Sequence, residues 1–353
     1  MAQREEKVVV SAGAGGLGAA IATESGSDLG VAMEEVKARG YWELVWRRLR
    51  RDKVAIASGI FIILLIAIAF GGSPIVKHLV GHGPNDLFLY KPAVNLAGLP
   101  ANPWTHVQNS TTGHTDVLPL GAANRLGQDE LLRLMYGAQI SLEVAIFSTI
   151  GVMLIGVILG ASAGYFRGWP DTIISRITEI TMAFPVLIFV ISLAATVGPR
   201  LDNITLGGVF PQGVITLVLI FTLFGWFYPA RIMRASVLSI REKEYVEAAR
   251  MVGASDARII RSHVLPHLVA PMIVYSTLIV ASYVLFEAGL SFLGVGIKFN
   301  ASWGNLLSGA VDFYTTRPLL MVWPGLALLF TTLAFNLLGD GLRDAFDPRA
   351  SHM

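Results

Sequence analysis

Residues 54–76 read VAIASGIFIILLIAIAFGGSPIV, and no charged side chain interrupts them. A helix of about 20 such residues, at ~1.5 Å per residue, crosses a hydrocarbon core of ~30 Å. This stretch therefore predicts a transmembrane helix. Five further uncharged apolar runs meet the same test: Val144–Phe166, Ile180–Pro199, Asn203–Ala230, Leu268–Phe286 and Pro318–Gly339. The sequence predicts an all-α integral membrane protein with six transmembrane helices.

The composition of the whole chain agrees with a membrane protein. Of the 353 residues, 54% are hydrophobic and 15% are charged, whereas a soluble domain has about 25% charged residues. Too little polar surface remains to cover a water-soluble fold. The net charge of +2 gives no reason to expect a nucleic-acid partner. The absence of cysteine excludes disulfides and thiolate metal ligands.

The basic residues predict the orientation of the chain. If the N-terminus is inside, 20 of the 27 Lys and Arg residues lie in inner segments. Cytoplasmic loops carry such an excess, so we expect both termini to be cytoplasmic. The basic cluster Arg47–Lys53 comes directly before the first run, which predicts that residues 54–76 act as a signal anchor.

The segments between the runs complete the predicted organisation. Residues 1–40 are rich in Gly, Ala and Ser, and they predict a flexible cytoplasmic arm. Residues 41–53 place apolar side chains at helical spacing among basic ones, which is typical of an interfacial amphipathic helix. Residues 77–131 form a long external segment. Residues 132–349 carry the other five spans and a cytoplasmic helical hairpin, residues 244–266.

Two features inside the runs are candidates for packing or transport. Gly156, Gly160 and Gly164 form consecutive G-x-x-x-G steps, which favour close helix packing inside the bundle over a dimer seam. Glu287 interrupts the fifth run, and a charge there faces the bundle interior or water. Glu287 is therefore a candidate residue of a translocation path, or else an internal hydrogen-bond partner. Prolines within the runs predict kinks at Pro185, Pro229, Pro271 and Pro324.

Patterns typical of enzymes and metal sites are incomplete in this chain. Residues 13–18 satisfy G-x-G-x-x-G, but too few residues precede the membrane for a dinucleotide-binding sheet. The i, i+4 pair His78 and His82 lacks acidic companions other than Asp86, so solvated histidines are favoured over a metal site. The chain has no G-x-x-x-x-G-K-[ST] phosphate loop. We expect no catalytic residue, no metal and no cofactor bound by this chain.

The largest inner loop predicts the helical hairpin. A short helix from Glu244 ends at Gly253, and a second begins after Ser255 as N-cap; Pro266 is expected to end the unit before the fifth span. Apolar residues remain on the water side of the membrane, and a partner is expected to cover them. These residues are Met251, Val252, Ile259 and Ile260.

The same loop resembles the EAA coupling motif of ABC importer permeases. The matching residues are Glu247, Ala248, Ala249, Gly253, Leu265 and Pro266. His263 is typical of the peptide-import subgroup. Further stretches resemble the C-type permease subunit of dipeptide, oligopeptide and nickel importers, in order from Tyr41 to Arg349. They include Tyr136-Gly137-Ala138, Phe184-Pro185, Leu290-Ser291-Phe292-Leu293-Gly294, Ser302-Trp303-Gly304-Asn305 and Gly339-Asp340-Gly341-Leu342-Arg343-Asp344.

Three stretches on the predicted outer side depart from that family. Residues 120–129 lack the usual Thr-Asp and carry Gln128 in place of Arg, and Gln139 replaces a second Arg. Residues 298–300 occupy a turn that is usually rich in proline. The inner coupling end keeps the pattern, so the departures concern substrate identity and docking of a binding protein.

The resemblance implies a type I importer core and a non-catalytic subunit in a bacterial or archaeal plasma membrane. Its implied partners are a homologous second permease, two ATP-binding subunits that hold ATP and Mg, and an external substrate-binding protein. The implied cargo is a short peptide; a nickel chelate, glutathione or another small solute on the same architecture is the alternative. A stand-alone channel or a membrane enzyme is the alternative from a different class.

Overall fold

The computed structural model describes residues 41–88, 94, 98–108, 113, 115–298 and 300–347. The predicted arm, residues 1–40, lies outside the described residues, as do residues 348 and 349 of the predicted core. The chain divides into two units, Met1–Val45 and Trp46–Met353. The described part of the first unit is the start of helix α2 (Tyr41–Leu49), and the rest of the fold belongs to the second.

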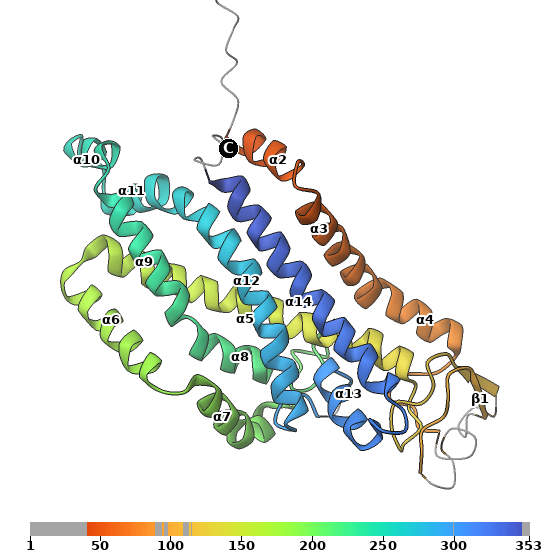
Figure 1. Ribbon diagram of the computed structural model, residues 1–353. Helices are drawn as coiled ribbons and strands as arrows, with labels where there is room; N and C mark the ends of the chain where they lie inside the picture. Colours follow the sequence, from red (N-terminus) through yellow and green to blue (C-terminus); the bar gives the residue numbers. More distant parts are fainter. Residues whose placement is uncertain are drawn as a thin grey trace, which may run out of the picture. The chain divides into compact units, whose positions relative to one another are not determined.

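Among the described residues, four continuous helical stretches are long and apolar enough to cross a membrane: Lys53–Val80, Glu130–Phe166, Asp256–Phe292 and Leu319–Phe346. Two bent helix pairs pass the same test, and counting each pair as one span gives six, the number predicted. The helices are α3 (Lys53–Ile66), α4 (Ser73–Val80), α5 (Glu130–Phe166), α6 (Gly168–Ala183), α7 (Val186–Leu201), α8 (Val214–Gly225), α9 (Phe227–Arg241), α10 (Glu244–Met251), α11 (Asp256–Ile259), α12 (Leu265–Phe292), α13 (Trp303–Ala310) and α14 (Leu319–Phe346) (Figure 1).

Two of the four predicted proline kinks accompany a break between helices. Helices α6 and α7 meet at 85° around Phe184 and Pro185. Helices α8 and α9 bend by 43° at Trp226, in the turn before Pro229, whose ring in a straight helix would clash with the carbonyl of Gly225. Pro271 and Pro324 lie within the continuous helices α12 and α14. The predicted span Asn203–Ala230 is wrong at its start, because helix α8 begins only at Val214.

Helix α5 begins at Glu130 rather than at Val144, so the predicted boundary of this span is wrong. The side chain of Asp129 caps the helix by accepting hydrogen bonds from the amides of Leu131 and Leu132. Charged residues of the first turns are buried among polar protein groups instead of facing lipid, which a count of uncharged residues does not detect. The first span also differs from 54–76, since α4 continues to Val80 and ends at Gly81, whose φ is +83°.

The predicted interfacial helix 41–53 is shorter than expected. Helix α2 ends at Leu49, and Asp52 then caps α3 through the amides of Val54 and Ala55. Within the second unit, the guanidinium of Arg50 lies 4.9 Å from the ring centre of the half-exposed Trp46. A basic group stacked on an exposed indole is typical of the membrane interface.

The long segment between α4 and α5 contains a small antiparallel sheet that the all-α prediction did not include. Strands β1 (Thr105–Gln108) and β2 (Thr115–Leu118) pair with Thr105 opposite Leu118. A separate apolar cluster joins Val107 and Leu118 of the two strands to Phe88 and Ala122. We call this part of the second unit, together with α13, the strand end; the helical hairpin lies at the opposite end of the helices (Figure 1).

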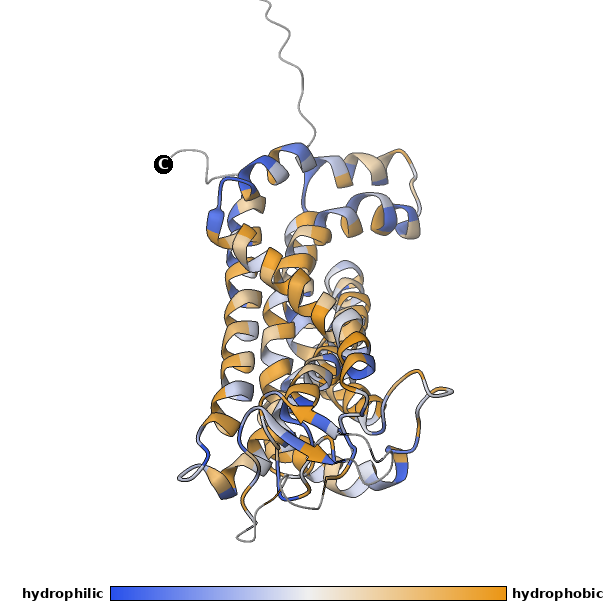
Figure 2. Cartoon of the chain, turned by 90° about the vertical axis from the view of Figure 1, so that its right-hand side faces the viewer, coloured by the Kyte–Doolittle hydropathy of each residue, from blue (hydrophilic) through white to orange (hydrophobic). Residues whose placement is uncertain are grey.

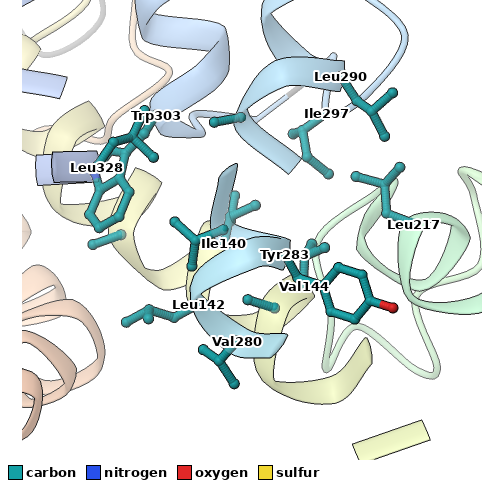
Figure 3. Close-up of a cluster of buried hydrophobic side chains, with 14 of the residues drawn as sticks. Ile140, Leu142, Val144, Leu217, Val280, Tyr283, Leu290, Ile297, Trp303 and Leu328 are labelled. Carbon is teal, nitrogen blue, oxygen red and sulfur yellow. The ribbon is translucent and has the colours of Figure 1, made fainter. Parts of the chain in front are cut away.

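The main core fills the space between α5, α8, α12 and α13. Figure 3 shows side chains from these helices converging, among them Leu142, Leu217, Tyr283, Leu290 and Trp303. Apolar residues dominate the middle of the helices and charged residues gather toward the helical hairpin, as Figure 2 shows. This distribution matches a bundle whose centre lies in hydrocarbon.

Candidate functional site

The helical hairpin is built as predicted at its first turn and differently at its second. Helix α10 ends at Met251, and Gly253 turns the chain with a φ of +87°, a conformation that favours glycine. Ser255 occupies the N-cap position of α11, without a side-chain hydrogen bond. The expectation that Pro266 ends the unit is wrong.

The second arm of the hairpin runs directly into the fifth span. A π-helical turn, Ile260–Val264, joins α11 to α12, and the amide of Leu265 donates to the carbonyl of Ile260. Pro266 therefore sits in the first turn of α12, where its missing N–H is tolerated. Residues 256–292 form one helical stretch, so the second arm and the span are continuous.

The tip of the hairpin is exposed and apolar, whereas its base is buried. Met251 and Val252 are 83% and 90% exposed. Ile259 was expected on the same surface, but it is fully buried, with Val246 and Val264, against residues of α5 and α9; Ile260 is partly buried. The apolar surface that a partner can cover is thus confined to the tip.

The residues matching the EAA pattern lie where a partner can reach most of them. Glu247, Ala248, Gly253 and Pro266 are exposed, whereas Ala249 and Leu265 are half-buried and pack against the cluster at the hairpin base. The exposed alanine leaves a low helix surface between the Glu247 carboxylate and the tip.

Polar contacts fix the hairpin to the ends of neighbouring helices. The Tyr165 hydroxyl at the end of α5 donates to Asp256 of α11, at 2.6 Å. Nearby, Arg234 of α9 binds Asp171 of α6 through two hydrogen bonds, of 2.5 and 2.8 Å. The sequence analysis missed these pairs because the partners are far apart in the chain.

The three glycines of α5 lie against α9. A Cβ added at Gly156 would meet the Cβ of Pro229 at 2.7 Å, and one added at Gly160 would meet the carbonyl oxygen of Ala230 at 2.4 Å. At Gly164 the nearest atom is the carbonyl oxygen of Arg234, at 2.8 Å. The stripe therefore packs inside the bundle, and α5 and α9 form its most extensive helix contact.

Glu287 lies in the interior with no exposed surface. Its two carboxylate oxygens accept hydrogen bonds from the hydroxyls of Ser141 of α5, at 2.6 Å, and Ser291 of α12, at 2.7 Å. Of the two roles that the sequence left open, this geometry favours the internal hydrogen-bond partner, which joins α12 to α5.

An apolar cavity of about 510 Å³ lies where α8 bends into α9, next to α7 and α12. Phe221 and Tyr283 stack within it with ring centres 4.9 Å apart, and the polar surface is limited to a few atoms. No local sequence pattern predicts this cavity, since its lining comes from four helices.

The comparisons with known proteins decide the family. Residues 156–352 match the model described as "Binding-protein-dependent transport system inner membrane component". The chain belongs to this family. Residues 40–92 also match the N-terminal TM domain of oligopeptide transport permease C.

Several permeases of this family are similar over most of the chain. The glutathione transport system permease protein GsiD of Pectobacterium atrosepticum is 34% identical over 318 residues, which are 90% of this chain and 94% of the relative. The dipeptide transport system permease protein DppC of Alkalihalophilus pseudofirmus is 33% identical, over 87% of this chain and 90% of the relative. A chain of the MetNI methionine ABC transporter, solved inward facing, aligns with a TM-score of 0.46 and 18% identity over 61% of this chain and 96% of its own.

At the strand end, this permease has a buried histidine that the sequence analysis placed in solvent. The ring nitrogens of His82 lie 3.0 Å from Asp129 and 3.3 Å from Asp116, and Phe88 packs edge-on against the ring. Burial alone lowers the pKa of His82, but the hydrogen bond and charge of Asp129, with the charges of Asp116 and Asp86, outweigh it and raise the pKa. No group in the described part of the chain has three residues suited to hold a metal.

Two departures of this permease from its family's pattern have clear positions. Gln128, in place of Arg, is buried and accepts a hydrogen bond from Arg133 at 2.7 Å. Gln139, in place of the second Arg, donates to the buried Glu143 at 2.9 Å. Gln128 thus accepts a hydrogen bond, which an arginine cannot do, whereas Gln139 donates one, as an arginine can.

Proposed function

We propose that this permease is the C-type subunit of an ATP-driven importer of short peptides. The proposal is supported by relatives named for dipeptide and putative peptide transport and by the match to the N-terminal domain of oligopeptide permease C. Import of glutathione is the second candidate cargo, because GsiD is similar along nearly the whole chain.

The observation that carries the proposal is the helical hairpin. Its tip exposes Met251 and Val252 to water, its base is buried against α5 and α9, and its second arm continues into α12. An apolar tip on a rigid stem is suited to seat in a cleft of another protein and to transmit that protein's movement.

The proposed partners are those that the resemblance implies. A homologous permease completes the pathway, two ATP-binding subunits hold ATP and Mg, and an external binding protein delivers the cargo. The hairpin faces the cytoplasm with both termini, and the strand end faces the outside. Glu247 makes polar contacts to one ATPase, while Ala248 and Ala249 permit close seating.

ATP closes the ATPase pair and displaces the hairpin, and α12 tilts with it. Two variants test this mechanism. Gly253→Pro disrupts the turn, because proline cannot adopt a φ of +87°. Glu247→Arg reverses a charge at the docking surface. Both variants should insert normally and assemble with their partners, yet uncouple ATP hydrolysis from peptide uptake. Glu247→Gln, which keeps the side-chain shape, serves as the matched control and should lose less coupling.

Normal uptake in both Gly253→Pro and Glu247→Arg would contradict the proposal that the hairpin transmits the movement of the ATPase to α12. The cargo is tested separately, by growth on peptides as sole nitrogen source and by uptake of labelled glutathione and nickel in a strain lacking the gene. Copurification of a tagged chain with a second permease and an ATPase tests the assembly.

A further inference from the structure

Arg133 at the strand end is a buried cation that forms no ion pair with another described residue. Only 6% of the residue's surface is exposed. Its Nη1 donates to the side-chain oxygens of Asn85, at 3.1 Å, and Gln128, at 2.7 Å, and its Nη2 donates to Asn305, at 2.9 Å. All three acceptors are neutral amides, and Nε has no hydrogen-bond partner. A buried charge is strongly unfavourable unless an opposite charge balances it.

The acidic residues around Arg133 do not supply that balance by contact. Among the described residues, no ion pair joins Glu130 to Arg133, although Glu130 is one turn earlier on α5 and interacts with its charge, and Oε1 of Glu130 has no hydrogen-bond partner. Asp129 binds His82. Asp312, which follows α13, pairs with Arg125 at 3.4 Å.

Arg133 lines a cavity of about 280 Å³ at the strand end. Besides Arg133, its polar lining consists of Asn124, Asn305 and Ser308, and no acidic residue lines it. Asn124 and Ser308 are partly exposed, and Gly309 beside them is exposed, so the cavity opens to the surface. A guanidinium whose protein partners are all neutral is suited to a carboxylate, which an arginine binds through charge-assisted hydrogen bonds.

We propose that this cavity binds the carboxylate of a small solute, with Arg133 as the anchoring cation and Asn305 and Ser308 as neutral neighbours. In the importer proposed above, the solute is the C-terminal carboxylate of a peptide arriving at the outer end. The inference rests on the proposed function only for this choice of the peptide as source of the carboxylate.

The decisive variant is Asn305→Asp, because it places a carboxylate on Arg133 inside the protein. The change replaces the Asn305 amide nitrogen, which donates to the carbonyl of Ile297 at 3.5 Å, by an oxygen that faces this carbonyl, and it supplies the missing charge. We expect the melting temperature to rise by several degrees and the affinity for an added carboxylate to fall at least tenfold. Asn203→Asp, the same change in an exposed loop, should alter neither.

The binding measurement uses the purified full-length chain in nanodiscs and titration calorimetry at constant ionic strength. The probes are acetate, L-alanyl-L-alanine and L-alanyl-L-alaninamide. The two carboxylates should bind saturably to the wild type and the amide at least tenfold more weakly. Tighter binding of the dipeptide than of acetate supports a peptide source, and equal binding supports a site for small carboxylates in general.

Arg133→Gln should lose binding of both carboxylates, whereas Arg125→Gln, the same change at an exposed arginine, should retain it. A lower melting temperature in Asn305→Asp would overturn the proposal, since it would mean that Glu130 already balances Arg133. Equal affinity for the dipeptide and its amide would also overturn it. None of these measurements needs an ATPase. The carboxylate site can therefore be refuted while ATP-coupled uptake is intact, and the importer proposal can be refuted while carboxylate binding is intact.

Discussion

Replacing Gly160 with alanine is the most direct test of how the bundle is held together. This glycine lies at the contact between α5 and α9, where an added Cβ would come within 2.4 Å of the carbonyl oxygen of Ala230 and 2.9 Å of the Cβ of Met233. Both obstacles are fixed to the backbone of α9, so no side-chain rotation can relieve them. The two helices must move apart.

The distance that α9 must move determines how much stability the Gly160→Ala variant should lose. Real Cβ atoms essentially never approach another atom closer than 3.0 Å, so α9 must shift by at least 0.6 Å along that direction. Overpacking of this kind costs about 1–3 kcal/mol. The same reasoning requires shifts of at least 0.3 Å at Gly156 and 0.2 Å at Gly164, from their nearest distances of 2.7 and 2.8 Å. The loss of stability should therefore rank Gly160→Ala first.

The assay is thermal unfolding of the purified chain in detergent, followed by circular dichroism. Gly289→Ala is the matched control, because it lies in helix α12 with no atom within 4 Å of an added Cβ, and replacing an unhindered helical glycine stabilises by about 0.5–1 kcal/mol. The two variants should shift the melting temperature in opposite directions. A Gly160→Ala variant as stable as the wild type would refute the packing geometry. If the variant lost only self-association, the alternative interpretation of the glycines as a dimer seam would be favoured.

Two further predictions concern the charged groups near the strand end. Because the folded-state pKa of His82 is raised above its unfolded value, its stabilisation is complete below about pH 6.5 and is lost as the pH rises through the raised pKa. The melting temperature should fall over that range in the wild type and not in His82→Gln; parallel curves would contradict the bridge to Asp116 and Asp129. Gln139→Arg should stabilise the folded protein by about 2 kcal/mol, because the new arginine pairs with Glu143, whose Oε2 has no hydrogen-bond partner. An unchanged melting temperature would exclude that pairing.

Hydropathy predicted the spans where lipid surrounds them and failed where protein does. The run 54–76 is apolar on all sides, and its helical stretch, Lys53–Val80, begins one residue earlier and ends four residues later than predicted. The start of α5 was missed because Arg133 and Glu143 are buried within the protein. A charge inside a helix marks the edge of the membrane only when no other segment satisfies it.

The candidate residues show the same division between local and distant information. The turn at Gly253 could be predicted because a positive φ is a property of one residue and its neighbours. The burial of Ile259 could not, since it depends on α5 and α9 packing against the hairpin base. His82 was misplaced for the same reason, because both of its aspartates come from other segments of the chain.

The positions of the rigid contacts indicate where this permease can bend. The helical stretch from Asp256 to Phe292 has 37 residues, a length of about 55 Å at ~1.5 Å per residue. Glu287, near its far end, is hydrogen-bonded to Ser141 of α5, and α5 is packed through its glycines against α9. In the proposed mechanism, a displaced hairpin should carry α12, α5 and α9 together, because separating them breaks a buried hydrogen bond or opens a close helix contact.

The breaks between helices are the positions where the bundle can still bend. The 85° break at Pro185 lies between α6 and α7, and the 43° bend at Trp226 lies between α8 and α9. At these positions the backbone is already irregular, so a change of angle costs fewer helical hydrogen bonds than it does within the regular turns of α5. The apolar cavity lined by residues of α7, α8, α9 and α12 lies beside the bend at Trp226. Movement driven from the hairpin should therefore change the size of this cavity more than it changes the contact between α5 and α12.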